Sequence, residues 1–147
     1  MNNNFMKEAI AQAKIAAASE EVPIGAVIVE NGKIIAKSRN QNISLKDPTA
    51  HAEILVLRQA ASFKNSARLD GCDLYVTLEP CPMCASAISL ARIRRVYYGL
   101  SDQKFGGVEN GPQIFKSSSC HHKPEVYSGI AEEESKQLLV DFFKSKR

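Results

Sequence analysis

Residues 72–100 read CDLYVTLEPCPMCASAISLARIRRVYYGL, and this stretch decides the fold. The apolar run CDLYVTL predicts a buried strand, and RRVYYGL predicts another. Between them Pro82 marks the start of a helix, because proline suits the first turn of a helix. A strand, a helix and a second strand in so short a span indicate two parallel strands joined by a right-handed crossover.

The segments upstream of this unit predict two helices and a hairpin. Apolar residues at roughly helical spacing favour a helix from about Asn4 to Ala18. IGAVIVE and KIIAKS surround Asn31-Gly32, a step typical of a tight hairpin because its turn needs positive φ at both central residues. Asp47-Pro48 is typical of an N-cap followed by a first-turn proline. The helix that it opens should carry AHAEILVLRQAA.

The segments downstream complete the predicted fold. A loop rich in glycine and serine runs from about residue 101 to 123, and EVYSG predicts a short last strand. AEEESKQLLVDFFKSKR, residues 131–147, predicts a closing helix that is acidic in its first turn and basic in its last, in accord with the helix dipole. Together the elements predict one α/β domain over residues 1–147, with a mixed sheet of about five strands covered by helices on both faces.

Composition limits the class of protein. The chain has 147 residues, of which 44% are hydrophobic and 24% are charged, as in an ordinary globular domain. No apolar run reaches the ~18 residues that a membrane span needs, and the N-terminus lacks the pattern of a signal peptide. We therefore expect a cytoplasmic protein with no membrane association and no nucleotide cofactor.

The charge of the chain does not by itself identify a partner. The formal net charge is only +3. Basic residues gather in two places, Arg92, Arg94 and Arg95, and Lys144, Lys146 and Arg147. Each cluster is compatible with an ordinary solvated surface and with a surface that faces phosphates.

The chemistry is concentrated in two short motifs, HAE at residues 51–53 and PCPMC at residues 80–84. Zinc binds imidazole nitrogen and thiolate sulfur, and a catalytic zinc keeps one position open for water. Cys81 and Cys84 are three apart at a predicted helix start, where the dipole and free N–H groups favour thiolates. His51 falls in the first turn of the preceding predicted helix. The sequence thus predicts one metal ion bound at two helix N-termini by His51, Cys81 and Cys84.

Glu53 has a separate predicted role. A carboxylate beside an activated water can take its proton and deliver that proton elsewhere. Zinc lowers the pKa of water from ~16 toward ~7, which makes such a transfer feasible at neutral pH. The water oxygen would attack an electron-poor ring carbon that bears an amino group. Glu53 would then protonate the ring nitrogen and assist the departure of ammonia.

Other interpretations of the cysteines stay open on this evidence. A lone Cys-x-x-Cys is also typical of a dithiol oxidoreductase. It is equally half of a four-ligand structural zinc site, which Cys120, His121 or His122 would complete. The joint pattern favours a deaminase, because a redox site has no use for the HAE motif and a structural site has no use for Glu53. For Cys72 and Cys120 we expect buried or idle thiols.

The two motifs also carry a family resemblance. HAE followed by PCxxC is the signature of the cytidine-deaminase-like superfamily of zinc deaminases. Longer segments resemble the bacterial tRNA-specific adenosine deaminases, namely EVPIGAVIVENGKIIAKSRN, DPTAHAEILVLRQA, LYVTLEPCPMC, RIRRVYYGLSDQKFG and LLVDFFKSKR. The resemblance implies a three-layer α/β/α fold, one zinc per subunit, a homodimer with active sites near the interface, and conversion of adenosine to inosine at position 34, the wobble position of the tRNA anticodon.

The resemblance further implies contacts with the anticodon loop. Asn40 matches a residue that contacts the purine. Asp102 and Lys104 match a segment that meets loop sugars and phosphates, and Phe143 matches an aromatic near the splayed bases. An unpaired loop base is cheaply flipped into a pocket, and stacking offsets part of that cost. From the residues alone, Asn40 is equally a turn former and Phe143 is a core residue.

The match is looser in two places. The chain has His121-His122 where the family often has Asn-His, and residues 105–119 match only loosely. Two rival functions follow from the same motifs. One is a deaminase of free guanine or cytosine, and the other is a zinc module that binds RNA without catalysis.

Overall fold

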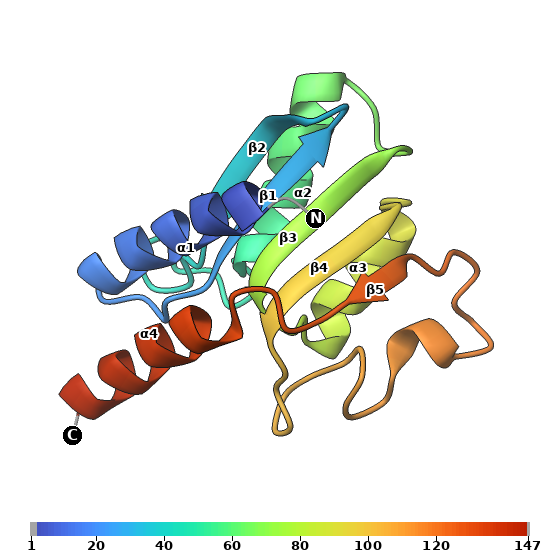
Figure 1. Cartoon of the computed structure of the whole chain (residues 1–147). Helices are drawn as coiled ribbons and strands as arrows, with labels where there is room; N and C mark the ends of the chain where they lie inside the picture. Colours follow the sequence, from blue (N-terminus) through green and yellow to red (C-terminus); the bar gives the residue numbers. More distant parts are fainter. Residues whose placement is uncertain (1–2, 147) are drawn as a thin grey trace.

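The predicted strand–helix–strand unit lies at the centre of the computed structural model, which describes residues 3–146 (Figure 1). It consists of β3 (Cys72–Leu78), α3 (Pro82–Leu90) and β4 (Arg95–Leu100). The two strands are parallel, with Leu74 opposite Val96. The prediction of two parallel strands joined through a helix is therefore confirmed.

The predicted hairpin is also present. β1 (Gly25–Glu30) pairs antiparallel with β2 (Lys33–Arg39), with an irregularity between Ile28 and Val29. The turn residues Asn31 and Gly32 have φ values of 52° and 76°, the left-handed geometry that the Asn-Gly step predicts.

The sheet is mixed and has five strands in the order β2-β1-β3-β4-β5. β1 also pairs antiparallel with β3, and β5 (Glu125–Tyr127) pairs parallel with β4. The short last strand lies at the edge of the sheet. The predicted mixed sheet is confirmed.

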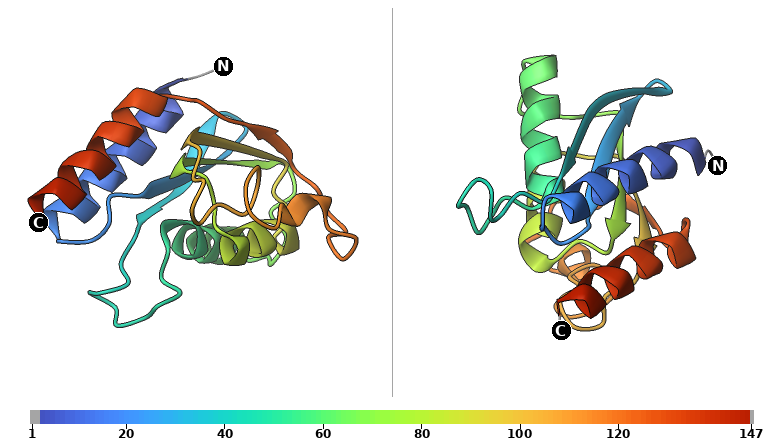
Figure 2. Two further views of the ribbon diagram at one scale, coloured as in Figure 1. Left: turned by 90° about the horizontal axis from the view of Figure 1, so that it is seen from below. Right: turned by 90° about the vertical axis from the view of Figure 1, so that its left-hand side faces the viewer.

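Helices cover both faces of the sheet (Figure 2). α2 (Ala52–Lys64) and α3 pack on one face, where the larger core contains Val56, Ile88, Leu74 and Val96. α1 (Asn3–Ala18) and α4 (Glu132–Ser145) cover the other face, where Met6 belongs to the smaller core. Within residues 3–146 no helix combines the length and the apolar character needed to cross a membrane.

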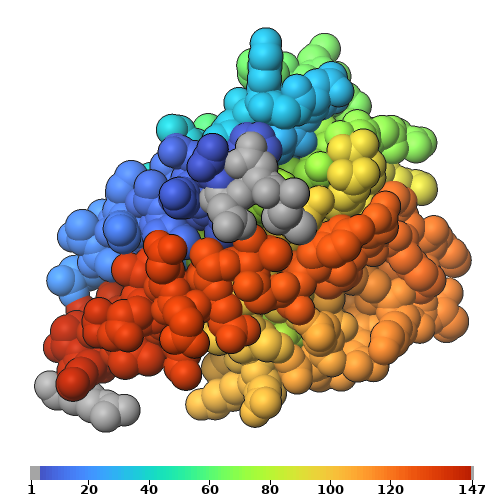
Figure 3. All heavy atoms as spheres, in the orientation of Figure 1, coloured from blue at the N-terminus to red at the C-terminus, as the bar shows by residue number. Residues whose placement is uncertain are grey.

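The closing helix has the predicted charge order. Its first turn contains Glu132, Glu133 and Glu134, and its last turn contains Lys144. It lies along α1 on the surface of the molecule (Figure 3). Arg147, the last member of the predicted basic cluster, lies outside the described residues.

The start of α2 differs from the prediction. The helix begins at Ala52, because Asp47 turns its carboxylate to the N–H and hydroxyl of Thr49 instead of capping a helix. The cap comes from farther away. Oδ1 of Asn40 accepts a hydrogen bond of 2.8 Å from the Ala52 N–H. His51 consequently occupies the N-cap position of α2.

The long connection from β4 to β5 contains one turn of 3-10 helix (Ile114–Lys116) and is organised by the buried Glu79. The Glu79 carboxylate accepts hydrogen bonds from the Ser101 hydroxyl, the Asn110 side chain and the backbone N–H groups of Asp102, Val108, Glu109 and Asn110. Burial opposes its ionisation, but these donors outweigh burial and lower the pKa of Glu79. The loop packs on the PCPMC turn, since the Gly107 N–H donates to the Pro80 carbonyl.

Candidate active site

The starts of α2 and α3 bring together the three predicted ligands. His51 is the N-cap residue of α2, Cys81 is the N-cap residue of α3, and Cys84 lies one turn into α3. Nδ1 of His51 lies 3.6 Å from the Cys81 sulfur and 3.5 Å from the Cys84 sulfur. Among residues 3–146 this is the one group of three or more such side chains close enough to hold a metal ion.

The donor set fits a tetrahedral zinc ion. With Zn–S near 2.3 Å and Zn–N near 2.05 Å, tetrahedral angles separate sulfur and nitrogen by about 3.6 Å. The two measured sulfur–nitrogen distances match this value. Imidazole and thiolate are ligands that zinc prefers, and a group of three leaves the fourth position for water.

A shared hydrogen bond shifts the pKa values of the two thiols in opposite directions. A hydrogen bond from Cys84 lowers the pKa of Cys81 to about 4, with help from His51 and against its own burial. The same hydrogen bond, together with burial, raises the pKa of Cys84. The bond to Cys81 raises the pKa of His51. One thiolate therefore forms readily, whereas two adjacent thiolates require a positive charge between them, which a metal ion supplies.

Glu53 lies in the first turn of α2 and is 4% exposed. Its burial, reinforced by the charge of Cys81, raises the pKa of Glu53 to about 7. A hydrogen bond with the Glu53 side chain contributes to the raised pKa of the Cys84 thiol. A carboxyl group with a pKa near neutrality can accept and donate a proton in turn. The position therefore suits the proton transfer predicted for Glu53.

A cavity of about 520 Å³ opens beside His51. That volume falls in the range of small-molecule sites and accommodates a nucleoside. Three regions of the chain supply its walls: the turn after α1, the segment after β2 and the end of α4. Its lining residues are Glu20, Glu21, Val22, Asn40, Asn42, Ile43, His51, Phe142 and Lys146.

The structure brings one of the four predicted RNA contacts into this cavity. Asn40 lines it, and because Oδ1 is bonded to α2, its Nδ2 group remains to meet a ligand. Asp102 accepts hydrogen bonds from the backbone N–H groups of Lys104 and Phe105, so its carboxylate organises its own loop. Lys104 is exposed, with its ammonium 5.4 Å from the Phe105 ring centroid.

Phe143 also lies outside the cavity. It is 51% exposed and packs edge to face on Phe142, and it is Phe142 that lines the cavity. Lys146 lies four residues after Phe142 on the same side of the C-terminal segment, with its ammonium 5.1 Å from the Phe142 ring centroid. The spacing of four residues between Phe142 and Lys146 could have indicated from the sequence that the two side chains share a helix face. Glu21 and Ile43 gave no comparable signal in the sequence.

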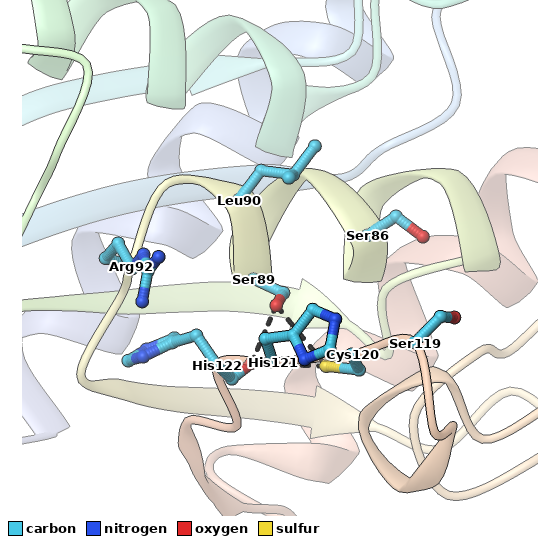
Figure 4. Close-up of a pocket in the computed structure, with 8 residues that line it drawn as sticks. All are labelled: Ser86, Ser89, Leu90, Arg92, Ser119, Cys120, His121 and His122. Carbon is cyan, nitrogen blue, oxygen red and sulfur yellow. Dashed lines mark hydrogen bonds between the residues drawn. The ribbon is translucent and has the colours of Figure 1, made fainter.

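The residues proposed to complete a four-ligand site lie elsewhere. Cys120, His121 and His122 line a second cavity of about 270 Å³ together with α3 residues (Figure 4). The Ser89 hydroxyl donates to the His122 carbonyl and contacts the Cys120 sulfur, and the His122 ring bonds to a backbone carbonyl. Within residues 3–146, His51, Cys81 and Cys84 thus form a group without a fourth Cys, His or carboxylate ligand.

The remaining cysteine and the arginine cluster also lie apart from the group. Cys72 is fully buried in the core, as predicted. Arg94 forms a two-pronged ion pair with Asp73, and Arg95 lies within 4 Å of the same carboxylate. Arg92 lines the second cavity.

The three-layer fold, together with a His-Cys-Cys group that could hold a metal ion and a neighbouring carboxylate, defines the class of protein, which is a deaminase. The model of the MafB19-like deaminase family matches residues 1–147. A tRNA-specific adenosine deaminase of Agrobacterium fabrum (strain C58 / ATCC 33970) is 55% identical over 144 residues, which cover 98% of this chain and 95% of that protein. The chain belongs to the tRNA-specific adenosine deaminase family, and the predicted resemblance is confirmed.

Solved structures agree with this assignment. One from a study of A-to-I editing by tRNA:A34 deaminases at the wobble position of transfer RNA has a TM-score of 0.93 and 54% identity, covering 94% of this chain and 100% of that chain. A guanine deaminase from Bacillus subtilis is more distant, with a TM-score of 0.66 and 43% identity over 69% of this chain and 66% of that chain. The predicted α/β/α fold is confirmed.

Proposed function

We propose that this chain deaminates adenosine to inosine at position 34, the wobble position of a tRNA anticodon, with a zinc ion held by His51, Cys81 and Cys84. The observation that carries the proposal is the open three-ligand group beside a buried carboxylate at the end of a nucleoside-sized cavity. The relatives named for tRNA and A34 supply the substrate class. Because tRNA is used in the cytoplasm, the proposal places the enzyme there.

The proposed chemistry depends on the position of Glu53. When bound, zinc supplies a Lewis acid that lowers the pKa of water toward neutrality. Glu53 accepts a proton as the water oxygen forms a bond to C6 of adenine, and it donates that proton to the ring nitrogen. The proton that remains on the new C6 oxygen then passes through Glu53 to the amino group, while the C6–N bond breaks, the C6 carbonyl forms and ammonia leaves. Burial of Glu53 excludes bulk water from these transfers.

The cavity walls explain how a loop nucleotide is held. We propose that Nδ2 of Asn40 contacts the purine, that Phe142 stacks against a base and that Lys146 faces a phosphate. Asp102, Lys104 and Phe143 lie outside the cavity, where the neighbouring nucleotides of the loop would pass. An unpaired nucleotide suits this arrangement because it leaves its stack at little cost.

The test is a reaction with a synthetic anticodon stem-loop that contains A34, followed by nucleoside analysis for inosine. Zinc is measured in the same sample. The expected result is inosine at position 34, no reaction of a G34 hairpin, and about one zinc per chain. Turnover of free guanine or cytosine without turnover of the hairpin would overturn the tRNA substrate in favour of a free-base deaminase. Zinc and RNA binding without any turnover would instead indicate a non-catalytic module.

We also propose that the protein is a homodimer. Phe63 on α2 and Leu90 on α3 are 70% and 81% exposed. The two helices form the layer on the opposite face of the sheet from α1 and α4 (Figure 2). Large apolar side chains that are exposed on neighbouring helices are typical of an interface between subunits.

A further inference from the structure

The turn between α1 and β1 contacts two separate walls of the substrate cavity. One wall is the segment of residues 41–46, hereafter the 41–46 loop, which contributes Asn42 and Ile43. The other wall is the end of α4, which contributes Phe142 and Lys146. The proposed chemistry uses no residue of this turn.

Glu21 holds the first wall. Its side chain is buried, with 2% exposure, and it also lines the cavity. Its two carboxylate oxygens accept hydrogen bonds of 3.1 Å from the Ile43 N–H and 2.8 Å from the Ser44 N–H. Hydrogen bonds to an ionised acceptor are stronger than neutral ones. The carboxylate therefore fixes the backbone at the point where Ile43 reaches the cavity.

The neighbouring Glu20 contacts the second wall. Its φ of 64° is a left-handed conformation that favours glycine at the end of a helix, yet the position keeps a carboxylate. That carboxylate pairs with the ammonium of Lys146. Two adjacent residues thus contact two walls whose sequences lie more than 90 residues apart.

The 41–46 loop needs such an anchor. It belongs to the excursion between β2 and His51, which the Gln41 N–H closes by donating to the Ala50 carbonyl. Ile43 and Leu45 are 69% and 51% exposed, so apolar burial contributes little to the order of the loop. Other hydrogen bonds, such as those from the Leu45 and Asp47 N–H groups, join residues within the excursion itself, whereas the two bonds to Glu21 connect the loop to the turn after α1. A wall that is ordered before binding removes an entropic cost from the binding step.

We propose that Glu21 is a positioning residue that sets the shape of the nucleotide-binding wall through the 41–46 loop. The inference rests on the proposed function, which it deepens by naming the residue that determines the fit of the loop nucleotide. Glu21 acts on substrate binding and not on proton transfer, because its carboxylate bonds to loop N–H groups and not to His51, Cys81, Cys84 or Glu53.

The first experiment measures the anchor directly, by amide hydrogen exchange on the zinc-loaded protein. Glu21→Gln replaces one acceptor oxygen with an NH₂ group and removes the charge. The Ile43 and Ser44 amides are expected to exchange at least about tenfold faster, the loss typical of one hydrogen bond to a charged group. The Ala52 amide serves as the internal control, because Asn40 holds it independently. Unchanged exchange at Ile43 and Ser44 would overturn the proposal.

The second experiment uses the A34 hairpin. Glu21→Gln is expected to raise KM about tenfold with kcat within about twofold and zinc content unchanged, because the groups that transfer protons keep their positions. Glu133→Gln, the same chemical change on an exposed residue of α4, should match the wild type. A fall in kcat with unchanged KM would contradict a positioning role.

Ile43→Ala keeps the proposal testable if Glu21→Gln folds poorly, because Ile43 is exposed. It should raise KM without faster exchange at Ser44, and an unchanged KM would overturn the proposal. Failure of the proposed function would give a different result from failure of the Glu21 proposal. A wild-type protein that leaves the hairpin unreacted rejects the tRNA substrate, while the exchange experiment still tests the anchor.

Discussion

Glu53 is the residue on which proposed catalysis depends most. Its carboxylate is buried beside the ligand group but is not one of the three ligands. Glu53→Gln keeps the size of the side chain and removes the proton shuttle. We expect single-turnover inosine formation to fall at least about 10³-fold, in the range of lost general acid–base catalysis, with zinc content unchanged. Retained activity, or loss of zinc together with activity, would contradict the assigned role.

Asn40 has two functions that substitution can separate. Its Oδ1 caps α2 between His51 and Glu53, and its Nδ2 is proposed to meet the purine. Asn40→Asp keeps an acceptor for the Ala52 N–H and removes the donor. Asn40→Ala removes both. Urea unfolding should show a loss of about 1 kcal/mol for the alanine variant and a smaller loss for the aspartate variant, whereas KM for the hairpin should rise in both. Equal loss of stability in the two variants would rule out the cap as the structural function.

At the scale of elements, a tyrosine stack crosses three strands. Tyr75 on β3 and Tyr97 on β4 stack with ring centroids 4.4 Å apart, and Tyr97 stacks on Tyr127 of β5 at 5.0 Å. Burial, reinforced by Tyr97, raises the pKa of Tyr75 to about 12 from an ordinary value of 10.0. The rings therefore join the parallel part of the sheet on the side covered by α1 and α4.

This stack predicts how stability depends on alkaline pH. A phenol with a higher pKa in the folded protein than in the unfolded chain keeps its proton longer when folded. The stability that it contributes is intact below pH 10 and is lost as the pH rises toward 12. The urea concentration at the unfolding midpoint should decrease as the pH is raised from 10 to 12. The midpoint of the Tyr75→Phe variant should decrease less steeply over the same range. Parallel curves for the two proteins would exclude Tyr75 as the cause.

The sequence predicted the elements that depend on local patterns. The Asn-Gly hairpin and the β3–α3–β4 unit follow from residues that are close in the chain, and so does the placement of Cys81 and Cys84 at the start of α3. The predicted start of α2 was wrong because the side chain that caps this helix, Asn40, lies twelve residues before the Ala52 N–H that it accepts from. The cavity walls escaped prediction for the same reason, since Glu20 and Lys146 are 126 residues apart and only packing brings them together.

At the scale of the whole molecule, the exposed apolar side chains Phe63 on α2 and Leu90 on α3 predict the oligomeric state. Leu90→Lys places a charge on the exposed apolar side chain that we assign to the subunit interface. A buried unpaired charge disfavours association strongly, so the variant should sediment as a monomer where the wild type sediments as a dimer. Lys136→Glu, on the exposed part of α4, is the matched control and should remain dimeric. A dimeric Leu90→Lys protein would place the interface elsewhere.

The two faces of the sheet carry unequal cores, and this inequality has a consequence for thermal inactivation. The hydrophobic cluster on the face of α2 and α3, which carry the proposed metal ligands, contains eighteen buried residues, whereas the cluster under α1 and α4 contains seven. The smaller layer supplies the Phe142 wall of the cavity. On warming, that layer should loosen first, so the enzyme should stop editing RNA while it still retains its ion. Heated samples would then recover activity on cooling without added zinc.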